Sequence, residues 1–162
     1  MTISYRLKQS YAKVEAHGPT LEGGAWHGPS LMESLKGVDV GQATVRPIEG
    51  RHTIWEIVNH CTYWMESVDK ALHGEVMESI PETEDWVGMG ETADDWKRDL
   101  ERMDQTYEKL QETIEGFEGD LDAMVGAQFG ENFFQFSHRK MLHGVADHNI
   151  YHAGQVSILK RK

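Results

Sequence analysis

The chain of 162 residues contains only one cysteine, Cys61. A single thiol excludes an internal disulfide framework and any zinc cluster built from several cysteines. If the chain binds a metal ion, histidine and carboxylate side chains must supply the ligands. Nine histidines are present for that role.

Long apolar runs are also missing. No stretch approaches the roughly 20 residues that are needed to cross a bilayer, and the opening MTISYRLKQSY lacks the apolar segment of a secretory signal. We therefore expect a cytoplasmic protein. Hydrophobic residues make up 39% of the chain and charged residues 27%, a composition typical of globular proteins. The length predicts a single domain over residues 1–162.

Basic residues are scarce relative to acidic ones. Lysine and arginine together number 16 and aspartate and glutamate 27, which gives a formal net charge of -11 at pH 7. This charge repels phosphate backbones and anionic lipid surfaces. We therefore expect neither a nucleic acid nor a membrane as partner, and a small molecule as substrate.

Apolar residues recur at three- and four-residue steps in several segments, the pattern of amphipathic helices. They predict helices over about residues 2–16, 53–73, 92–115 and 137–159, with a short extra helix in SLMESLKG (30–37). Thr53 and Glu56 have the spacing of a capping box, and Gly37, Gly74 and Gly116 are expected to follow helix ends.

The segments between these helices are predicted as loops. Residues 38–52 and 74–91 are expected to form long crossing loops, while FGENFFQF, within the loop 117–136, predicts either a short strand or a packed loop. Four long helices favour an all-α, four-helix bundle. The long connections argue against a simple up-down-up-down order, because adjacent antiparallel helices need only short ones.

Three histidines are predicted to face the core. A helix turns by about 100° per residue, so His148 and His152 lie at about -20° and +20° from Met141, inside the apolar stripe of the last helix. His60 lies at about -60° from Ile57, on the core side of the second long helix. These positions predict one mononuclear metal site with open coordination positions. The alternative is that the three are core histidines satisfied by hydrogen bonds.

Other histidine-based metal sites do not fit the sequence. In HNIYH the residue after the first histidine is Asn149, whereas the H-E-x-x-H proteases have their glutamate base at this position. The only Glu-x-x-His, from Glu49 to His52, falls in a predicted loop, whereas di-iron bundles carry this motif on helices. Nickel or zinc suits three imidazoles best, and iron or manganese stays open as an alternative.

Several neighbouring residues are candidates for supporting roles. Glu56 either orients the His60 ring or serves only in the capping box, and Gln155 either hydrogen-bonds near the site or is a polar residue at a helix interface. We expect Asp147 to be solvated and His27 to have a loop or capping role. Cys61 faces the core, where a thiol resists ionisation, so it is not expected to be a nucleophile.

Three segments resemble the DinB-like (DinB/YfiT) superfamily of metal-dependent enzymes. They are GGAWHGPSLMESLKGV, RPIEGRHTIWEIVNHCTYWMESVDKALHGE and MLHGVADHNIYHAGQVSILKR, and they occur in the family's order from about residue 22 to the end. The resemblance implies an up-down-down-up bundle that is often a homodimer. It also implies a metal held by one histidine of the second helix and two of the last, which fall on His60, His148 and His152.

The expected function follows from the histidine site and this resemblance. Some members of the superfamily resemble thiol S-transferases that use a low-molecular-weight thiol, and others resemble thiol-dependent isomerases. We expect a metalloenzyme that activates a thiol or water for attack on a small electrophilic substrate, similar to a thiol S-transferase or a hydrolase. The alternative is a non-catalytic, stress-related helical bundle that binds a metal or another ligand.

Overall fold

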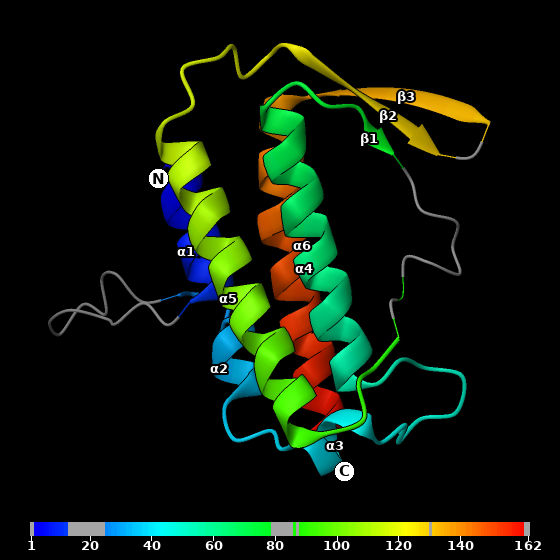
Figure 1. Cartoon of the computed structure of the whole chain (residues 1–162). Coiled ribbons are helices and arrows are strands. Elements are labelled where there is room, and N and C mark those ends of the chain that lie inside the picture. The colour runs from blue at the N-terminus through cyan, green and yellow to red at the C-terminus, as the bar shows by residue number, and fades with distance from the viewer. Residues whose placement is uncertain (1, 13–24, 79–85, 87, 130, 161–162) are drawn as a thin grey trace, which may run out of the picture.

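The computed structural model describes residues 2–12, 25–78, 86, 88–129 and 131–160 (Figure 1). Within them it contains six helices and one three-stranded sheet, with the bounds α1 (Ile3–Tyr11), α2 (Leu31–Leu35), α3 (Val40–Thr44), α4 (Ile54–Leu72), β1 (Met77–Glu78), α5 (Ala93–Glu115), β2 (Met124–Phe129), β3 (Asn132–Ser137) and α6 (His138–Leu159). The prediction of a mostly helical chain is confirmed. None of the described helices is both long and apolar enough to span a membrane.

Most of the predicted helix ends are confirmed. Thr53 and Glu56 form the expected reciprocal capping box at the start of α4, and Gly116 caps the end of α5. Gly37 and Gly74, just beyond α2 and α4, have φ angles of 76° and 91°, a backbone conformation that side chains with a Cβ disfavour. The first helix is shorter than predicted because α1 ends at Tyr11. The remainder of that prediction, residues 13–16, lies outside the described residues.

All three of the predicted loops contain regular structure, so the chain is mostly helical and not all-α as predicted. Residues 38–52 include α3, at whose start Asp39 and Gln42 form a capping box. Only Ala43 of this helix is fully buried, so its sequence shows no repeat of apolar residues from which a helix could be predicted. The strand alternative for FGENFFQF is correct, because β2 and β3 pair as an antiparallel hairpin. In the second crossing loop, β1 pairs in parallel with β2, Met77 opposite Ala127. Pairing over such a separation leaves no local sequence pattern.

Contacts between α4 and α5 show that these two helices run parallel. The indole Nε1 of Trp55 donates to Asp99 Oδ2 over 2.7 Å near the start of both helices. Nearer their ends, Thr113 Oγ1 donates to Asp69 Oδ1 over 2.6 Å. Two consecutive helices that run parallel need a long connection, and residues 74–91 were predicted as one.

The other long helices run in the opposite direction. Ser4 of α1 donates to Glu115 of α5, and Tyr11 of α1 donates to Asp104, so the two helices are antiparallel. Figure 1 shows α6 running opposite to α4, with the sheet at one end of the helices. Buried apolar side chains of all four long helices join in one core cluster. This packing brings the middle of α4 against the middle of α6.

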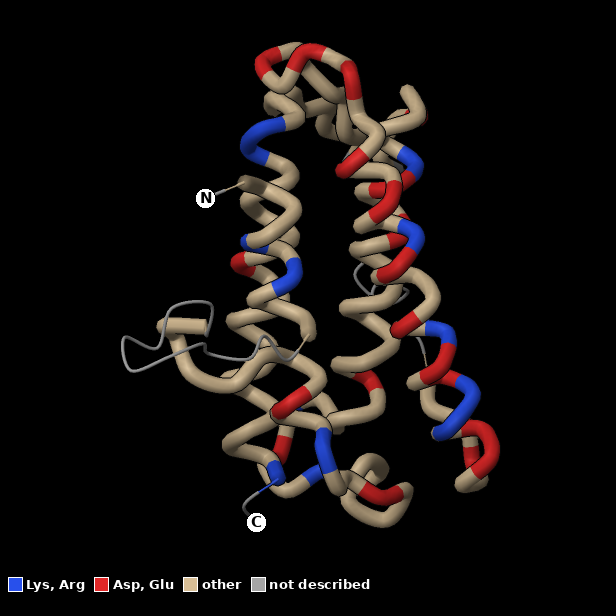
Figure 2. Tube along the Cα trace, turned by 90° about the vertical axis from the view of Figure 1, so that its left-hand side faces the viewer, with Lys and Arg blue, Asp and Glu red and all other residues tan. Residues whose placement is uncertain are grey.

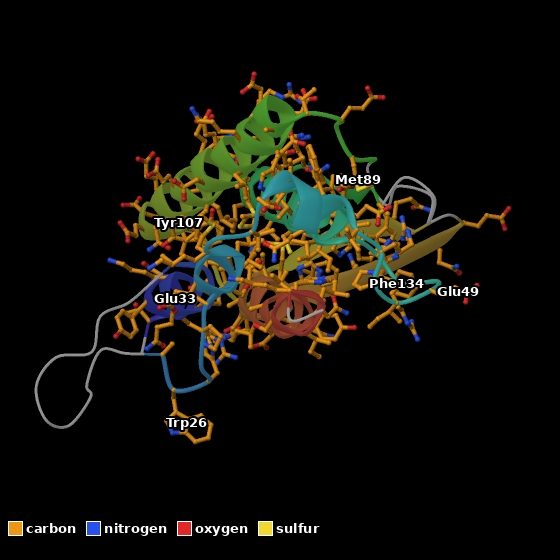
Figure 3. The ribbon with its side chains drawn as sticks, turned by 90° about the horizontal axis from the view of Figure 1, so that it is seen from below. Trp26, Glu33, Glu49, Met89, Tyr107 and Phe134 are labelled. Carbon is orange, nitrogen blue, oxygen red and sulfur yellow. The ribbon has the colours of Figure 1, made fainter. Side chains whose placement is uncertain are left out.

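Charged and exposed side chains lie outside this core. Acidic and basic residues alternate along the length of α5 (Figure 2), whereas the second half of α6, from Asn149 to Leu159, carries no Asp, Glu, Lys or Arg. Trp26 is 99% exposed and projects away from the helices, and Phe134 of β3 is also exposed (Figure 3). The uncharged half of α6 is the half that carries His152.

Candidate metal centre

The three histidines predicted from the sequence lie together where α4 packs on α6. The Nε2 atom of His148 is 3.0 Å from Nε2 of His60 and 3.0 Å from Nε2 of His152. His60 and His152 are buried, and His148 is half-buried. The spacing of four residues puts His148 and His152 on the same face of α6, one turn apart.

Two contacts to the same ring nitrogen present a hydrogen-bonding problem. A neutral imidazole nitrogen carries either one hydrogen or one lone pair, so His148 Nε2 cannot donate to one neighbour and accept from the other. Without a cation, one hydrogen or one lone pair of His148 Nε2 must serve both contacts. A cation among three lone pairs would satisfy all three nitrogens, so this donor set fits a divalent metal ion.

Gln155 holds the ring of His152 in place. The ring Nδ1–H of His152 donates to the Gln155 side-chain oxygen over 2.7 Å, one turn further along α6. With the hydrogen on Nδ1, the Nε2 atom keeps its lone pair, which is directed at His148. Of the two roles predicted for Gln155, the structure thus shows the hydrogen bond near the site. The Nδ1 atom of His148, by contrast, is buried without a partner in the described part of the chain.

Burial keeps these rings neutral at physiological pH. It lowers the pKa of His148 to about 3, and the neighbouring His152 and His60 act in the same direction. Burial also lowers the pKa of His152 to about 4, helped by His60 and opposed by the hydrogen bond to Gln155. Neutral imidazoles are the form that binds metal ions, so His148 and His152 are in the ligand state at pH 7.

Trp86 covers the cluster from the side of the loop before α5. Its indole stacks on the His60 ring at 4.1 Å between centroids, with 4° between the planes, and on the His52 ring at 3.4 Å with 6°. Two rings at these separations cannot share one face of an indole, so Trp86 lies between the two histidines. The sequence did not predict this arrangement, because loop residues have no helical period from which a facing direction follows.

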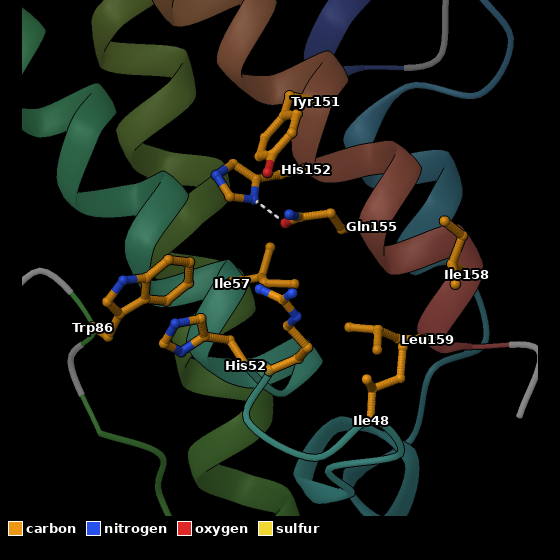
Figure 4. A pocket seen from close by; sticks show the side chains of 10 residues that line it. Ile48, His52, Ile57, Trp86, Tyr151, His152, Gln155, Ile158 and Leu159 are labelled. Carbon is orange, nitrogen blue, oxygen red and sulfur yellow. Dashed lines mark hydrogen bonds between the residues drawn. The ribbon is translucent and has the colours of Figure 1, made fainter.

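A pocket of about 380 Å³ adjoins the cluster (Figure 4). In Figure 4, His52 and Trp86 lie on one side of it, and Tyr151 on the other, near His152 and Gln155. We call it the Arg51 pocket, and its lining residues are Ile48, Arg51, His52, Ile57, Trp86, Tyr151, His152, Gln155, Ile158 and Leu159. Its volume is in the range of sites for small molecules.

A second pocket, of about 300 Å³, lies on the His148 side of the cluster. We call it the apolar pocket, and its lining residues are Trp64, Val68, Met77, Phe136, Met141, Gly144, Val145 and His148. Its walls come from α4, α6 and the sheet, so strands β1 and β3 form part of the site. The histidine cluster thus lies between a pocket with polar groups and one that is almost wholly apolar.

The remaining candidate residues do not join the cluster. Glu56 is in its capping box and accepts from Arg46 over 2.8 Å; burial opposes its ionisation, but these hydrogen bonds outweigh burial and hold its carboxyl pKa below the usual range. Asp147 pairs with Arg6 on α1. Burial raises the pKa of the Cys61 thiol, which agrees with the prediction that it is not a nucleophile. His27 is exposed and lines neither pocket.

Comparison with known proteins identifies a family. The profile of the DinB superfamily matches residues 26–156, a span that begins before α2, includes all three histidines of the cluster and ends within α6. No curated protein and no solved structure gives a significant match.

Proposed function

The chain belongs to the DinB superfamily, and we propose that His60, His148 and His152 hold one divalent metal ion at the active site of an enzyme. The observation that carries this proposal is the convergence of three imidazole Nε2 atoms, with His148 Nε2 3.0 Å from each of the other two. The low pKa values of His148 and His152 support it, because both rings are neutral without a metal.

The proposed reaction is attack of a thiol or water on a small electrophilic substrate. A divalent ion on three neutral imidazoles retains an open coordination position and lowers the pKa of a thiol or water there. Nickel or zinc suits this ligand set best, while iron or manganese is an alternative. Because Cys61 is buried and poorly ionised, a thiol nucleophile would come from a low-molecular-weight co-substrate.

The residues around the cluster have distinct roles in this proposal. Gln155 keeps the His152 lone pair on Nε2, and Trp86 shields one face of His60 from water. The Arg51 pocket and the apolar pocket give a small molecule access to the cluster from either side. Since His152 lines one pocket and His148 the other, two substrates can approach the same centre.

We extend the proposal to the architecture. The parallel pair α4 and α5, with α1 and α6 running the other way, supports the up-down-down-up bundle expected for this superfamily. A single domain over residues 1–162 and a homodimer stay predictions. Light scattering on the purified protein would measure its molar mass and so test the homodimer.

A non-catalytic metal-binding bundle is the alternative function. One observation favours it: no carboxylate is among the described lining residues of either pocket, so Tyr151 is the only general acid or base group among them besides the histidines. An enzyme should consume a small electrophile in the presence of a thiol or water only when the histidine cluster is intact. A binding protein should hold the metal without such turnover.

Elemental analysis of purified protein tests the metal site. We expect about one equivalent of a divalent metal in the native chain and loss of most of it in the His148→Ala, His152→Ala double variant. His143→Ala is the matched control, because His143 lies on the same helix but outside the cluster. It should retain the native metal content.

Equal, substoichiometric metal in the native chain and the double variant would contradict the proposal. Circular dichroism at 222 nm, a general measure of helix content, would show whether each variant is folded before its metal content is compared. Loss of metal from His143→Ala as well would indicate a nonspecific effect on α6.

A further inference from the structure

We infer that Arg51 binds the carboxylate of a small acidic substrate and thereby directs the rest of that molecule at the histidine cluster. The inference rests on the proposed function, and it names the class of substrate that the site accepts. It starts from the charge of the Arg51 pocket. Arg51 is the only Asp, Glu, Lys or Arg among the described lining residues of this pocket.

Arg51 also differs from the other arginines of the described chain. Five of them, Arg6, Arg46, Arg98, Arg102 and Arg139, each form an ion pair with a carboxylate. The exposed side chain of Arg51 has no ion pair or hydrogen bond within the described residues. The chain has 27 acidic residues and a net charge of -11, yet this guanidinium beside a pocket pairs with none of the described carboxylates, so it can take its anion from a ligand.

The backbone of Arg51 is nevertheless held in place. Its N–H donates to the Ile48 carbonyl over 3.1 Å, which closes a turn, and its own carbonyl accepts a hydrogen bond from Arg46. Gly50 in this turn has a φ of 69°, a left-handed conformation that glycine adopts readily. The turn thus fixes the backbone of Arg51 beside the pocket.

The chemistry of the pocket favours a monocarboxylate with a short apolar body. A guanidinium presents a planar fork of donors that matches a carboxylate with two hydrogen bonds. One formal positive charge balances one negative charge. The rest of the wall supplies apolar contacts from Ile48, Ile57 and Leu159, and a volume of about 380 Å³ suits a small molecule. Because His152 lines the same pocket, a molecule held by Arg51 lies next to the cluster.

Calorimetric titration of the purified protein with three probes tests this inference. The probes are 3-mercaptopropionate, 1-propanethiol, which replaces the carboxylate by a methyl group, and propionate, which lacks the thiol. We expect 3-mercaptopropionate to bind about tenfold more tightly than 1-propanethiol, because charge-assisted hydrogen bonds form only with the carboxylate. Arg51→Gln should remove this advantage and leave 1-propanethiol binding unchanged.

The control variant is Arg98→Gln, which makes the same change of charge on α5 and should retain the tenfold preference. Equal binding of 3-mercaptopropionate by the native chain and Arg51→Gln, or an equal loss in both variants, would overturn the inference. Arg51→Lys keeps the charge without the planar fork and should recover part of the preference.

The propionate titration separates this inference from the proposed function. Binding of propionate should depend on Arg51 both in the metal-loaded protein and in protein from which a chelator has removed the metal. If the thiols do not bind but propionate still does so through Arg51, the thiol chemistry fails and the carboxylate site stands. If propionate binding is independent of Arg51, the carboxylate site fails regardless of the metal.

Discussion

His152 and Gln155 form a hydrogen-bonded pair on one face of α6, in which the ring Nδ1–H donates to the amide oxygen over 2.7 Å. The pair is one helical turn long, so both members are held by the same helix. It determines which nitrogen of His152 carries the hydrogen, and therefore which one offers a lone pair to the cluster.

Replacing Gln155 should weaken metal binding. In Gln155→Ala the ring loses its acceptor, and we expect the dissociation constant for Zn²⁺ or Ni²⁺ to rise by about 10- to 100-fold, the usual effect of removing such a partner. Gln155→Glu keeps an acceptor and should retain affinity. Competition with a chromophoric chelator measures both. Gln105→Ala on α5, away from the cluster, serves as control; unchanged affinity in Gln155→Ala would argue against the role of this pair.

Replacing Trp86 should expose the cluster. Its indole lies between His52 and His60, so Trp86→Ala removes the cover from one face of His60. We expect a chelator to extract the metal several-fold faster from Trp86→Ala, with Trp86→Phe between this variant and the native chain. The control is Trp26→Ala, because Trp26 is almost fully exposed. Identical extraction rates in Trp86→Ala and the native chain would show that the stack does not protect the site.

The stability of metal-free protein should depend on pH below 6.5. Folded His148 and His152 have pKa values of about 3 and about 4, against about 6.5 in an unfolded chain. Below pH 6.5 the unfolded chain therefore binds more protons at these two positions than the folded chain does. The free energy of unfolding is therefore not reduced by these histidines above pH 6.5. Below pH 6.5, toward pH 4, it declines by up to about 1.4 kcal/mol per pH unit for each histidine.

Urea unfolding at pH 7.5, 6.0 and 5.0 measures this decline. The His148→Ala, His152→Ala variant lacks both groups and should show a flatter pH profile over the same interval. If the two profiles are parallel, these histidines do not retain low pKa values in the folded chain.

Two helical glycines offer a test of the packing around the cluster. Apart from the adjacent residues and the nearby helix backbone, a Cβ at Gly144 or Gly154 of α6 would meet no atom within 4 Å. Gly144→Ala and Gly154→Ala should each stabilise the chain by about 0.5 to 1 kcal/mol, measured by urea unfolding, because alanine favours the helix. Only Gly144 lines the apolar pocket, so only its substitution should alter binding of an apolar probe there.

Gly90 provides the contrasting case. A Cβ at this position would come within 2.5 Å of Asp95 Cβ and 2.9 Å of the Trp55 ring. Gly90→Ala should therefore destabilise the chain, since buried Trp55 has no room to move. Equal effects of Gly90→Ala and Gly154→Ala would contradict this account of the packing.

The parts of the molecule that the sequence predicted correctly depend on local periodicity. The boundaries of α4 and α5 follow from capping residues and from glycines just beyond the helix ends, and α6 begins after its N-cap residue Ser137. The inward positions of His60, His148 and His152 follow from the rotation of about 100° per residue. Both kinds of information lie within a few residues of the position concerned.

The parts that the sequence missed depend on contacts between distant segments. The short strand β1 gains its partner from β2, far along the chain, and α3 has too few buried residues to show a period. Trp86 and Arg51 reach the site from loops, in which no helical repeat indicates a direction.

The sequence by itself determined that three histidines face inward, because the position of a residue along a helix fixes the side of the helix on which it lies. Only the tertiary structure decided that α4 and α6 bring the histidine Nε2 atoms together, that Trp86 stacks on His60 and that Arg51 and His152 line the same pocket. These relationships arise from the packing of whole helices and the paths of their loops. Each of them joins segments whose proximity depends on the complete fold.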